Sequence, residues 1–435
     1  MGNCLILLTN YYPFYKGEEY LESEIEHLAA KFDRIFIIST MVSKNMKPTR
    51  IVPKNAVVLP VRMNFSWNGK VKMFLSQFRS IQRDPIKKEM IKKDSKGKIL
   101  NRLYCTYFES RAMAVYKRIE EMLSNYDFDR FNSIIIYSYW FYITARVAVE
   151  LKRKYFSNCK PYTFSRAHGY DINEHVNILK YLPERNYLLK YLDNVFPVSQ
   201  NGVDFLREKY TEYANKVDVR RLGTKRLGGK KQNSNNFLHI VSCSTVRKLK
   251  RIDLIIEALE ILQYKKIKFK WTHIGGGPDY KKMKRLAMEK LDKNSFFFTG
   301  HLRNDEVLNW YQNNPTTVFV NTSTSEGVPV SIMEAMSMSI PVIATNVGGT
   351  KEIVKHEVTG YLLDKDCTKN DLAKYLMKIK SMDRDDYETM CERAYNLWQE
   401  LCDAEKIYNE FTKEIITIAK RVKKTNEVNL WNSQL

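Results

Sequence analysis

The sequence predicts an α/β protein with two doubly wound parallel-sheet domains in tandem, and three observations carry this prediction. The chain has 435 residues, more than the ~100–200 residues of one ordinary domain. Short β-branched and aromatic runs alternate with longer amphipathic runs along almost its whole length, which is typical of parallel sheets covered by helices. A Gly-, Lys- and Asn-rich stretch at residues 223–236 has no periodicity and indicates a linker.

The first half of the chain predicts one Rossmann-like domain at residues 1–222. Its apolar runs of strand length are residues 4–8, 34–39, 133–138, 161–165 and 194–199. Its amphipathic stretches of helix length are residues 18–31, 104–124, 139–154 and 199–210.

The second half predicts a similar domain at residues 237–398. Its expected strands are residues 237–244, 268–275, 296–300, 317–322, 341–345 and 359–363. Everything beyond residue 368 has a helical pattern, and a C-terminal helix at residues 399–435 is expected to return to the first domain. Two sheets of this type predict a ligand-binding cleft between the carboxyl edges of their strands.

Cysteine usage and hydropathy exclude several classes of protein. The seven cysteines are scattered, with no CxxC pair and no His/Cys cluster, which argues against a disulfide framework and a zinc site. No apolar run reaches the ~18 residues of a bilayer span. The start, MGNCLILLTNYYP, lacks the basic region of a signal peptide. We therefore expect a cytoplasmic protein with no metal and no cofactor.

The charge is strongly basic, at 71 Lys and Arg against 49 Asp and Glu. Such an excess attracts nucleic acid, anionic lipid or phosphorylated substrates. Residues 70–103 hold eleven Lys and Arg against three acids, interleaved with apolar residues. This pattern fits a segment that lies on an anionic membrane surface, or a solvated pair of surface helices. The first alternative predicts a peripheral protein on the inner face of the plasma membrane.

One stretch, STSEGVPVSIMEAM at residues 323–336, is typical of an anion site. It follows an expected strand, and Pro329 can open a helix at its first position, which would direct free N–H groups at the loop around Glu326. Glu334 is the only charged residue from Gly327 to Thr350. A buried carboxylate needs hydrogen-bond donors, and either sugar hydroxyls or an internal Arg or Lys could supply them.

The stretch STSEGVPVSIMEAMSMSIPVIATNVGGTKEIV resembles the E-x7-E region of retaining family-4 glycosyltransferases, which have the GT-B fold of two Rossmann-like domains. Three further stretches resemble the family in the expected order: SCSTVRKLKRIDLIIEAL, HIGGGPDYKKM and FTGHLRNDEVLNWY. The similarity is strongest to the sub-group that builds bacterial capsule, exopolysaccharide and lipopolysaccharide.

The resemblance implies roles for two acids and a lysine in the second half. Glu326 would reach the transferred sugar near its anomeric carbon, Glu334 would accept hydrogen bonds from the donor ribose, and Lys250 would pair with the diphosphate. Other donor-binding positions implied are Gly327, Val328 and Val330 for sugar or phosphate, and Gly275, Gly276, His301 and Leu302 around the nucleotide base.

One departure from the family lies five residues before Lys250, where an Arg is usual and this chain has Thr245. Arg247 is one candidate to replace that charge, and Arg251 is the other. A missing guanidinium fork would weaken diphosphate binding unless another Arg fills in.

The resemblance implies that the first domain (residues 1–222) binds the acceptor and that the second (residues 237–398) binds the nucleotide-sugar donor. In the first domain, two loops resemble the family. Gly17 would let the backbone approach the diphosphate, although Glu18 stands where the family often has a second glycine. In the loop from Ser165 to Asp171, His168 would contact the sugar, and Arg166 or Asp171 would hold the loop. We count His168 with Glu326 and Lys250 as the expected catalytic residues.

The resemblance implies a metal-independent hexosyl- or N-acetylhexosaminyltransferase that uses a nucleoside diphosphate sugar, with UDP favoured over GDP, and a glycan or lipid-linked acceptor. An NDP-sugar epimerase and a catalytically silent partner subunit remain alternatives. A nucleic-acid-binding protein is disfavoured, because no basic-aromatic recognition motif is present. The D-x-D triplets at Asp127 and Asp383 are expected in turns or helix caps.

Overall fold

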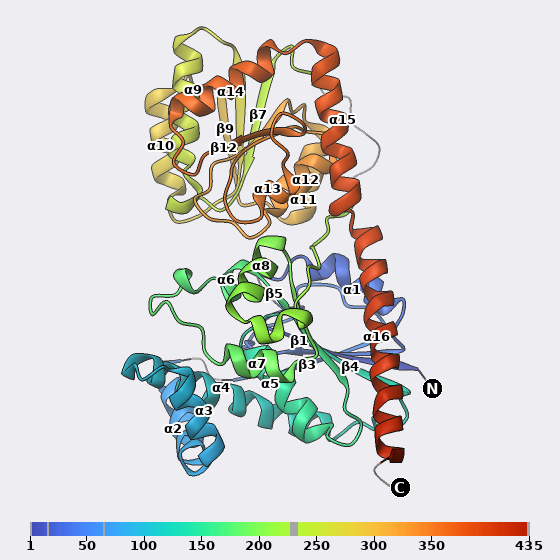
Figure 1. Cartoon of the computed structure of the whole chain (residues 1–435). Coiled ribbons are helices and arrows are strands. Elements are labelled where there is room, and N and C mark those ends of the chain that lie inside the picture. The colour runs from blue at the N-terminus through green and yellow to red at the C-terminus, as the bar shows by residue number, and fades with distance from the viewer. Residues whose placement is uncertain (1, 15–16, 64–65, 227–233, 433–435) are drawn as a thin grey trace. The chain divides into compact units, whose positions relative to one another are not determined.

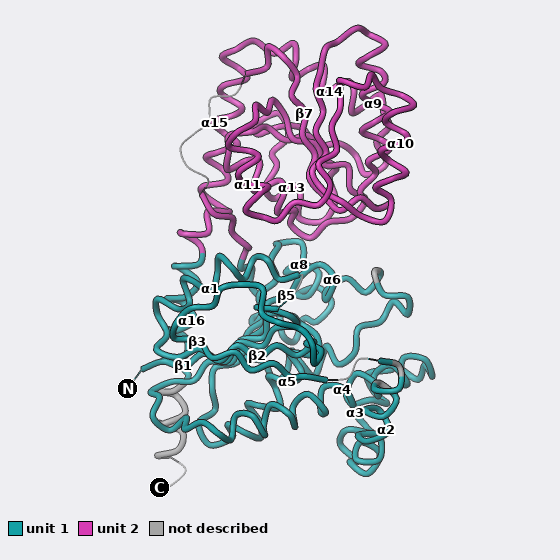
Figure 2. Tube along the Cα trace, turned by 180° about the vertical axis from the view of Figure 1, so that it is seen from behind, with its two compact units in different colours: residues 1–220, 408–435 teal, residues 221–407 magenta. Residues whose placement is uncertain are grey.

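The computed structural model describes residues 2–14, 17–63, 66–226 and 234–432. The chain divides into two compact units, which Figure 2 colours separately. Unit 1 comprises residues 1–220 and 408–435, and unit 2 comprises residues 221–407. Half of the predicted linker, residues 227–233, lies outside the described residues.

Unit 1 contains a six-stranded parallel sheet in the order β3-β2-β1-β4-β5-β6, which is the doubly wound order in which the chain starts at the centre and works outwards twice. The strands are β1 Asn3–Thr9, β2 Arg34–Ser39, β3 Ala56–Pro60, β4 Ser133–Ser138, β5 Tyr162–Ala167 and β6 Asn194–Pro197. Five of them match the predicted strands. The strand that the sequence pattern missed is β3, at one edge of the sheet.

Both faces of this sheet are covered, and β1 shows why. Leu5 and Leu7 point into a core with helices α1 and α16, whereas Cys4, Ile6 and Leu8 point into a core with α4 and α5. The helices of this unit are α1 Leu21–Ala29, α2 Trp67–Arg83, α3 Pro85–Asp94, α4 Ile99–Leu123, α5 Ile143–Glu150, α6 Gly169–Ile172, α7 Arg185–Tyr191 and α8 Gln200–Lys209.

The C-terminal helix α16 (Ala404–Asn432) belongs to unit 1 from Tyr408 onward. Phe411, Ile415 and Ala419 are buried in the same core as Leu5 and Leu7. The prediction that the chain returns to its first domain is therefore confirmed (Figure 1).

The basic segment at residues 70–103 forms the helix pair α2 and α3 and the start of α4. Asp84 caps α3, because its carboxylate accepts the N–H groups of Ile86 and Lys87, and Pro85 occupies the first helical position. Lys87 Nζ lies 2.7 Å from the buried Glu109 carboxylate of α4, which fastens α3 to the unit.

Unit 2 repeats the topology with the order β12-β11-β10-β7-β8-β9, again a doubly wound parallel sheet. Its strands are β7 Leu238–Cys243, β8 Phe269–Ile274, β9 Phe296–Gly300, β10 Val318–Asn321, β11 Val342–Thr345 and β12 Gly360–Leu363. All six match the predicted strands to within a residue or two. The predicted α/β class with two Rossmann-like sheets is confirmed.

Helices cover both faces of this second sheet (Figure 1). One core contains residues of α9, α10 and α14, and the other contains residues of α11, α12, α13 and α15. Their bounds are α9 Ile252–Tyr264, α10 Tyr280–Lys290, α11 Asn304–Asn313, α12 Val330–Ser337, α13 Thr350–Ile353, α14 Lys369–Ser381 and α15 Arg384–Leu401. Among the described residues, no helix is long and apolar enough to cross a bilayer.

Candidate functional site

The candidate site of unit 2 begins where β10 ends and α12 starts. β10 ends at Asn321, and α12 begins at Val330 with Pro329 as its N-cap. The expectation that Pro329 is the first helical residue is wrong by one position, because its backbone is extended (ψ 111°). The N–H of Ile332 closes the first turn on Pro329 O at 3.1 Å, so the earliest N–H groups of α12 have no acceptor within the helix.

Lys250 and Glu326 meet at this edge of the sheet. Lys250 Nζ lies 2.5 Å from Glu326 Oε1, and Asn321 Nδ2 donates to the same oxygen at 3.2 Å. Both charged side chains are largely covered, at 18 % and 12 % exposure. The sequence placed Lys250 and Glu326 in one site, but it gave no role to Asn321, which its position as the last, polar residue of an apolar strand could have indicated.

The backbone around Lys250 is joined to the loop that carries Glu326. Thr322 Oγ1 donates to Lys250 O at 2.9 Å, and Thr324 N donates to Leu249 O at 2.8 Å. These bonds bring two loops together that are more than 70 residues apart in the sequence. The geometry of the ion pair is therefore set by backbone contacts and not by two long side chains alone.

Glu334 lies inside α12 and is 6 % exposed. Burial raises the pKa of Glu334 to about 7, and the hydrogen bond from Asn304 Nδ2 at 2.8 Å opposes this shift. Asn304, the first residue of α11, is a site residue that sequence reasoning missed. A donor amide leaves the carboxylate free to accept further hydrogen bonds, as from a diol.

Cys243 lies near both Glu334 and Lys250, because both charges act on its thiol. Burial and the Glu334 carboxylate raise the pKa of the Cys243 thiol, whereas the Lys250 ammonium lowers it. Cys243 is the last residue of β7. Lys250 and Glu334 therefore both lie near the carboxyl end of the central strand β7, the place where doubly wound sheets bind ligands.

Glycines bring backbone segments together around this edge. Gly275 has φ +139°, and a Cβ there would lie 2.0 Å from Ser244 O, so only glycine fits. The neighbouring Gly276 packs against His301, which is exposed. Leu302 is half-buried against the core of α12. The four residues thus lie together, while their contact with a base stays a prediction.

The loop after Glu326 is held by a second glycine pair. A Cβ on Gly348 (φ +54°) would lie 1.9 Å from Glu326 O, and Gly349 N donates to Gly327 O at 2.7 Å. Val328 is buried in the core beside α12. The backbone of the loop is therefore fixed on both sides of the Glu326 side chain.

The two arginines that could replace the missing charge at Thr245 have different environments in the structure. Arg251 has φ +45°, and its guanidinium donates to Thr322 O at 2.8 Å and to Cys367 Sγ at 3.3 Å. Arg247 is exposed, as is Thr245. Arg251 thus serves to hold the loops together, which leaves Arg247 as the candidate for an anion contact.

In unit 1, His168 follows β5 and is half-buried. Its Nε2 lies 3.0 Å from Tyr139 O, and because a carbonyl only accepts, Nε2 carries the proton and Nδ1 is left as an acceptor. Burial and the Arg166 charge lower the pKa of His168 to about 3, which the bond to Tyr139 opposes. The imidazole is therefore neutral near pH 7, suited to accept a hydroxyl proton in a hydrogen bond.

Asp171 fastens the loop that carries His168. Its carboxylate accepts His168 N at 2.5 Å and Phe141 N at 2.7 Å. Burial raises the pKa of Asp171 to about 7, against the opposing effects of Arg185 and these N–H groups. Asp171 thereby joins the end of β5 to the segment after β4.

Arg166 lies deeper, with its side chain fully buried. Its guanidinium donates to Tyr137 Oη at 2.6 Å, to Arg220 O at 2.7 Å and to Glu24 Oε1 at 3.1 Å, and it stacks over Phe411 at 4.5 Å. These contacts join β4, β5, α1 and α16. Arg166 therefore stabilises the interior of unit 1. Its contacts are with several elements of the unit, and not only with the loop that it was expected to hold.

The opening loop contains a site feature that sequence reasoning missed. Gly17 has φ +79°, as a glycine expected to permit close approach should. Glu18 follows with φ +62° and is 4 % exposed, and its carboxylate accepts the N–H groups of Asn10, Tyr11 and Tyr12. The only signal in the sequence was an acid in place of the second glycine.

The D-x-D triplets occupy the predicted turn and cap. Asp127 Oδ1 accepts the N–H of Asp129 at 3.0 Å, and Asp383 is the N-cap of α15, accepting the N–H of Asp386 at 2.8 Å. Within the ranges that the structure describes, no three His, Cys, Asp or Glu side chains gather as metal ligands.

Comparison with known proteins finds a family match in the unit 2 region. Residues 228–397 match the family model described as Glycosyl transferases group 1. The colanic acid biosynthesis glycosyltransferase WcaL of Escherichia coli (strain K12) is 25 % identical over 261 residues, 57 % of this chain and 60 % of that protein. The amylovoran biosynthesis glycosyltransferase AmsK of Erwinia amylovora is 26 % identical over 129 residues, 29 % of this chain and 32 % of that protein. The chain thus matches 60 % or less of the length of these curated relatives.

Solved structures extend the similarity to both units. Anabaena Alr3699/HepE, in complex with UDP and glucose, has a TM-score of 0.62 at 17 % identity, covering 95 % of this chain and 99 % of that one. Sucrose-phosphate synthase from Thermosynechococcus elongatus has a TM-score of 0.69 at 16 % identity, covering 95 % and 98 %. At these identities the likeness shows the fold, and this fold is GT-B.

Proposed function

We propose that this chain, whose residues 228–397 match the glycosyl transferases group 1 family model and whose fold is GT-B, is a glycosyltransferase of cell-surface polysaccharide synthesis. It moves a sugar from a nucleoside diphosphate sugar to a hydroxyl of a glycan or lipid-linked acceptor, with retention of anomeric configuration. The names of the relatives from Escherichia coli and Erwinia amylovora, which refer to colanic acid and amylovoran, support the polysaccharide assignment.

The pairing of Lys250 with Glu326, beside the start of α12, carries this proposal. Sugar transfer from a nucleoside diphosphate breaks the bond between the anomeric carbon and a phosphate oxygen and forms a bond to the acceptor oxygen. Negative charge grows on the leaving diphosphate while positive charge grows on the sugar ring. One ammonium and one carboxylate at 2.5 Å match these two charges.

In the proposed mechanism, Lys250 and the first N–H groups of α12 stabilise the leaving diphosphate, and Glu326 faces the sugar. The acceptor's proton passes to the leaving phosphate oxygen, so no separate general base is required. Glu334, with Asn304 on one oxygen, receives the ribose hydroxyls. His168 Nδ1 accepts a hydrogen bond from the transferred sugar.

We propose a UDP-sugar as donor, with a hexose or an N-acetylhexosamine as the transferred group. The structural neighbour from Anabaena is titled as a complex with UDP and glucose, and the pneumococcal O-GlcNAc transferase GtfA, with a TM-score of 0.55, is titled as a complex with UDP and GlcNAc. We further propose that Lys250 and α12 supply the positive charge at the diphosphate without a resident metal. EDTA treatment should therefore leave turnover unchanged.

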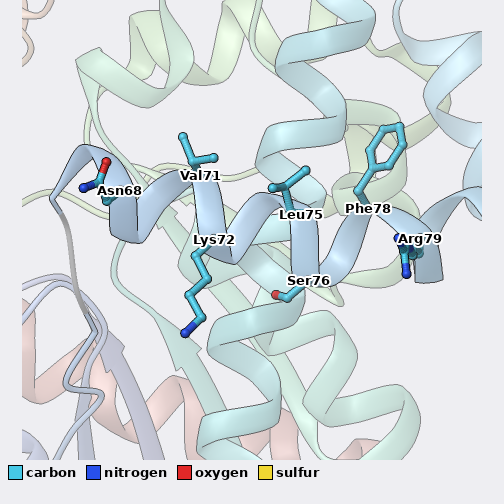
Figure 3. Close-up of a pocket in the computed structure, with 7 residues that line it drawn as sticks. All are labelled: Asn68, Val71, Lys72, Leu75, Ser76, Phe78 and Arg79. Atoms are coloured by element: carbon cyan, nitrogen blue, oxygen red, sulfur yellow. The ribbon is translucent and has the colours of Figure 1, made fainter.

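We also propose that α2 and α3 bind the anionic inner surface of the plasma membrane, where a lipid-linked acceptor would be found. Figure 3 shows Val71, Leu75 and Phe78 on one side of α2 and Lys72 on the other. These residues line a surface hollow of about 810 Å³. Leu75 is 59 % exposed. Apolar side chains beside lysines are the arrangement of an interfacial helix, in which the lysines meet anionic headgroups.

The test is release of free nucleoside diphosphate from a panel of UDP- and GDP-sugars, with and without acceptor extracts. Acceptor-dependent release of UDP supports the proposal. Interconversion of the sugar without any acceptor would identify an epimerase instead. Binding of no donor, measured by calorimetry, would identify a silent partner subunit and overturn the enzyme assignment.

A further inference from the structure

The Glu18 carboxylate accepts four hydrogen bonds, three from the backbone of its own loop and one from a distant side chain. Its Oε1 accepts Asn10 N at 2.7 Å and Trp140 Nε1 at 2.6 Å. Its Oε2 accepts Tyr11 N at 2.8 Å and Tyr12 N at 2.6 Å. Successive backbone N–H groups form a concavity that suits an anion, and here the anion is a side chain of the same loop.

This arrangement has a cost that a simple turn would avoid. Glu18 adopts a left-handed backbone (φ +62°), which is unfavourable for a residue with a Cβ by roughly 1–2 kcal/mol. Its carboxylate is buried at 4 % exposure, which is costly without donors. The surroundings therefore over-determine the position of this carboxylate, a pattern that is characteristic of functional sites.

Trp140 is the one side chain among the four donors to Glu18, and its ring also contacts His168. The Trp140 and His168 rings lie 4.5 Å apart at 45°, and the Tyr139 and His168 rings lie 4.9 Å apart. The imidazole thus contacts two consecutive aromatic side chains that follow β4. Its Nε2 is bonded to the carbonyl of the first of them, Tyr139.

The backbone and the indole ring of Trp140 are held by different groups. Ser138 Oγ and Thr144 Oγ1 donate to Trp140 O at 2.8 and 3.0 Å, so they fix its backbone. Glu18 bonds to the indole nitrogen at the far end of the side chain. The rotation of the ring about its side-chain torsions, and hence its face against His168, depends on Glu18.

We propose that Glu18 is a positioning residue for His168: its carboxylate holds the Trp140 ring, which holds the imidazole with Nε2 on Tyr139 O and with Nδ1 as its acceptor. This inference rests on the proposed function, because it gives His168 a transferred sugar to meet. The charged groups around the imidazole are Arg166 on β5 and Asp171 on α6. The hydrogen bonds given above for these two side chains do not include one to Trp140.

An amide cannot replace this carboxylate. Four donors converge on the two oxygens of Glu18, whereas Gln has one acceptor oxygen and an NH₂ group that would face two of those donors. Glu18→Gln therefore releases either the indole together with Asn10 N–H, or the N–H groups of Tyr11 and Tyr12. Trp140→Phe keeps an aromatic ring against His168 and removes only the indole N–H and the second ring.

The experiment compares Glu18→Gln, Trp140→Phe and the double variant with wild type. Glu121→Gln, an exposed acid on α4 paired with Arg118, is the matched control. The ¹⁵N NMR signals of the His168 ring report its tautomer, and His168→Gln assigns them. Wild type and the control should show one Nε2–H tautomer, whereas Glu18→Gln should show a mixture.

In transfer assays, Glu18→Gln should lower kcat by up to about 10²-fold, the effect of a small misplacement of a reacting group, with the KM for the donor unchanged. Trp140→Phe should lower it similarly, and the double variant should be no worse than either, because both act through one contact. Multiplying losses, or unchanged His168 signals in both Glu18→Gln and Trp140→Phe, would overturn the inference.

Two possible failures of the experiment still leave the inference testable. If Glu18→Gln does not fold, Trp140→Phe carries the NMR test alone, since its loop N–H groups keep the Glu18 carboxylate. If wild type transfers no sugar from any donor, the proposed function fails, but the NMR comparison still decides whether Glu18 positions His168.

Discussion

The Lys250 ammonium and the Glu326 carboxylate lie 2.5 Å apart and neutralise each other within unit 2. Both are mostly covered, so their attraction is stronger than that of an exposed pair. A diphosphate that reaches Lys250 must compete with Glu326 for the same ammonium. We expect donor binding to release the carboxylate and so to make it available to the sugar.

Replacing Glu326 should separate chemistry from binding. Glu326→Gln should lower turnover on the order of 10²-fold, as loss of one transition-state contact does, while donor affinity holds or rises because Lys250 loses its competitor. Steady-state kinetics and calorimetry with the donor measure the two effects. Glu289→Gln, an exposed acid on α10, is the control. Near wild-type turnover in Glu326→Gln would remove Glu326 from the mechanism.

Glu334 should make stability depend on pH in an unusual direction. Its pKa is raised from 4.5 to about 7 in the folded state, so the folded protein binds more protons than the unfolded chain between these values. Stability from this group is complete below pH 4.5 and is lost as pH rises to about 7, by roughly 3 kcal/mol.

Glu334→Gln should remove this loss, because an amide does not titrate. Denaturant unfolding of wild type and Glu334→Gln at pH 5 and pH 8 measures it, with the difference between the two proteins isolating this one group. We expect wild type to lose more stability than the variant on going to pH 8. An equal loss in both proteins would contradict the raised pKa.

The two arginines near Thr245 should respond differently to substitution. Arg247→Ala should weaken binding of nucleoside diphosphate with no change in Tm, because Arg247 is exposed. Arg251→Ala should lower Tm, because Arg251 bonds to Thr322 O and Cys367. Thermal melts with and without UDP measure both. Arg285→Ala, another exposed arginine, on α10, serves as the control, and equal UDP affinity in Arg247→Ala and wild type would contradict the assignment.

The basic face of α2 should govern membrane binding. Lys72→Glu with Arg79→Glu should weaken binding to vesicles containing anionic lipid by on the order of 10²-fold or more, since each basic residue near the surface contributes about 1 kcal/mol. Vesicle co-sedimentation at two salt concentrations measures it. Lys281→Glu with Lys282→Glu on α10 makes the same charge change elsewhere and should bind as wild type does. Equal weakening in both would indicate a general charge effect instead.

The central strands were predictable because they are buried on both faces and therefore appear as continuous apolar runs. β3 was missed because it lies at the sheet edge, and only Leu59 of its five residues is buried. The helix predicted at residues 139–154 was too long at its start, since Tyr142 has a non-helical backbone, and its last part, Leu151–Tyr155, winds as a π-helix. The local pattern of apolar and polar residues does not show where a strand lies at a sheet edge or where packing changes the winding of a helix.

The site was predictable where one short segment contains the chemistry, as in the stretch with Glu326 and Glu334. The missed residues depend on contacts between distant segments. Glu18 meets Trp140 across 122 positions, and Asn304 meets Glu334 across 30. The choice between Arg247 and Arg251 likewise needed the position of Thr322, which only the folded chain supplies.

The return of α16 to unit 1 means that this unit is built from two parts of the chain made at different times. Residues 221–407 separate them, which at 5–20 residues per second is a delay on the order of 10–40 s during synthesis. Until Phe411 and Ile415 arrive, the apolar face of β1 that includes Leu5 and Leu7 has no cover from α16. A growing chain therefore lacks this cover throughout the synthesis of unit 2, and it is at this stage that chaperone binding would protect the apolar surface from aggregation.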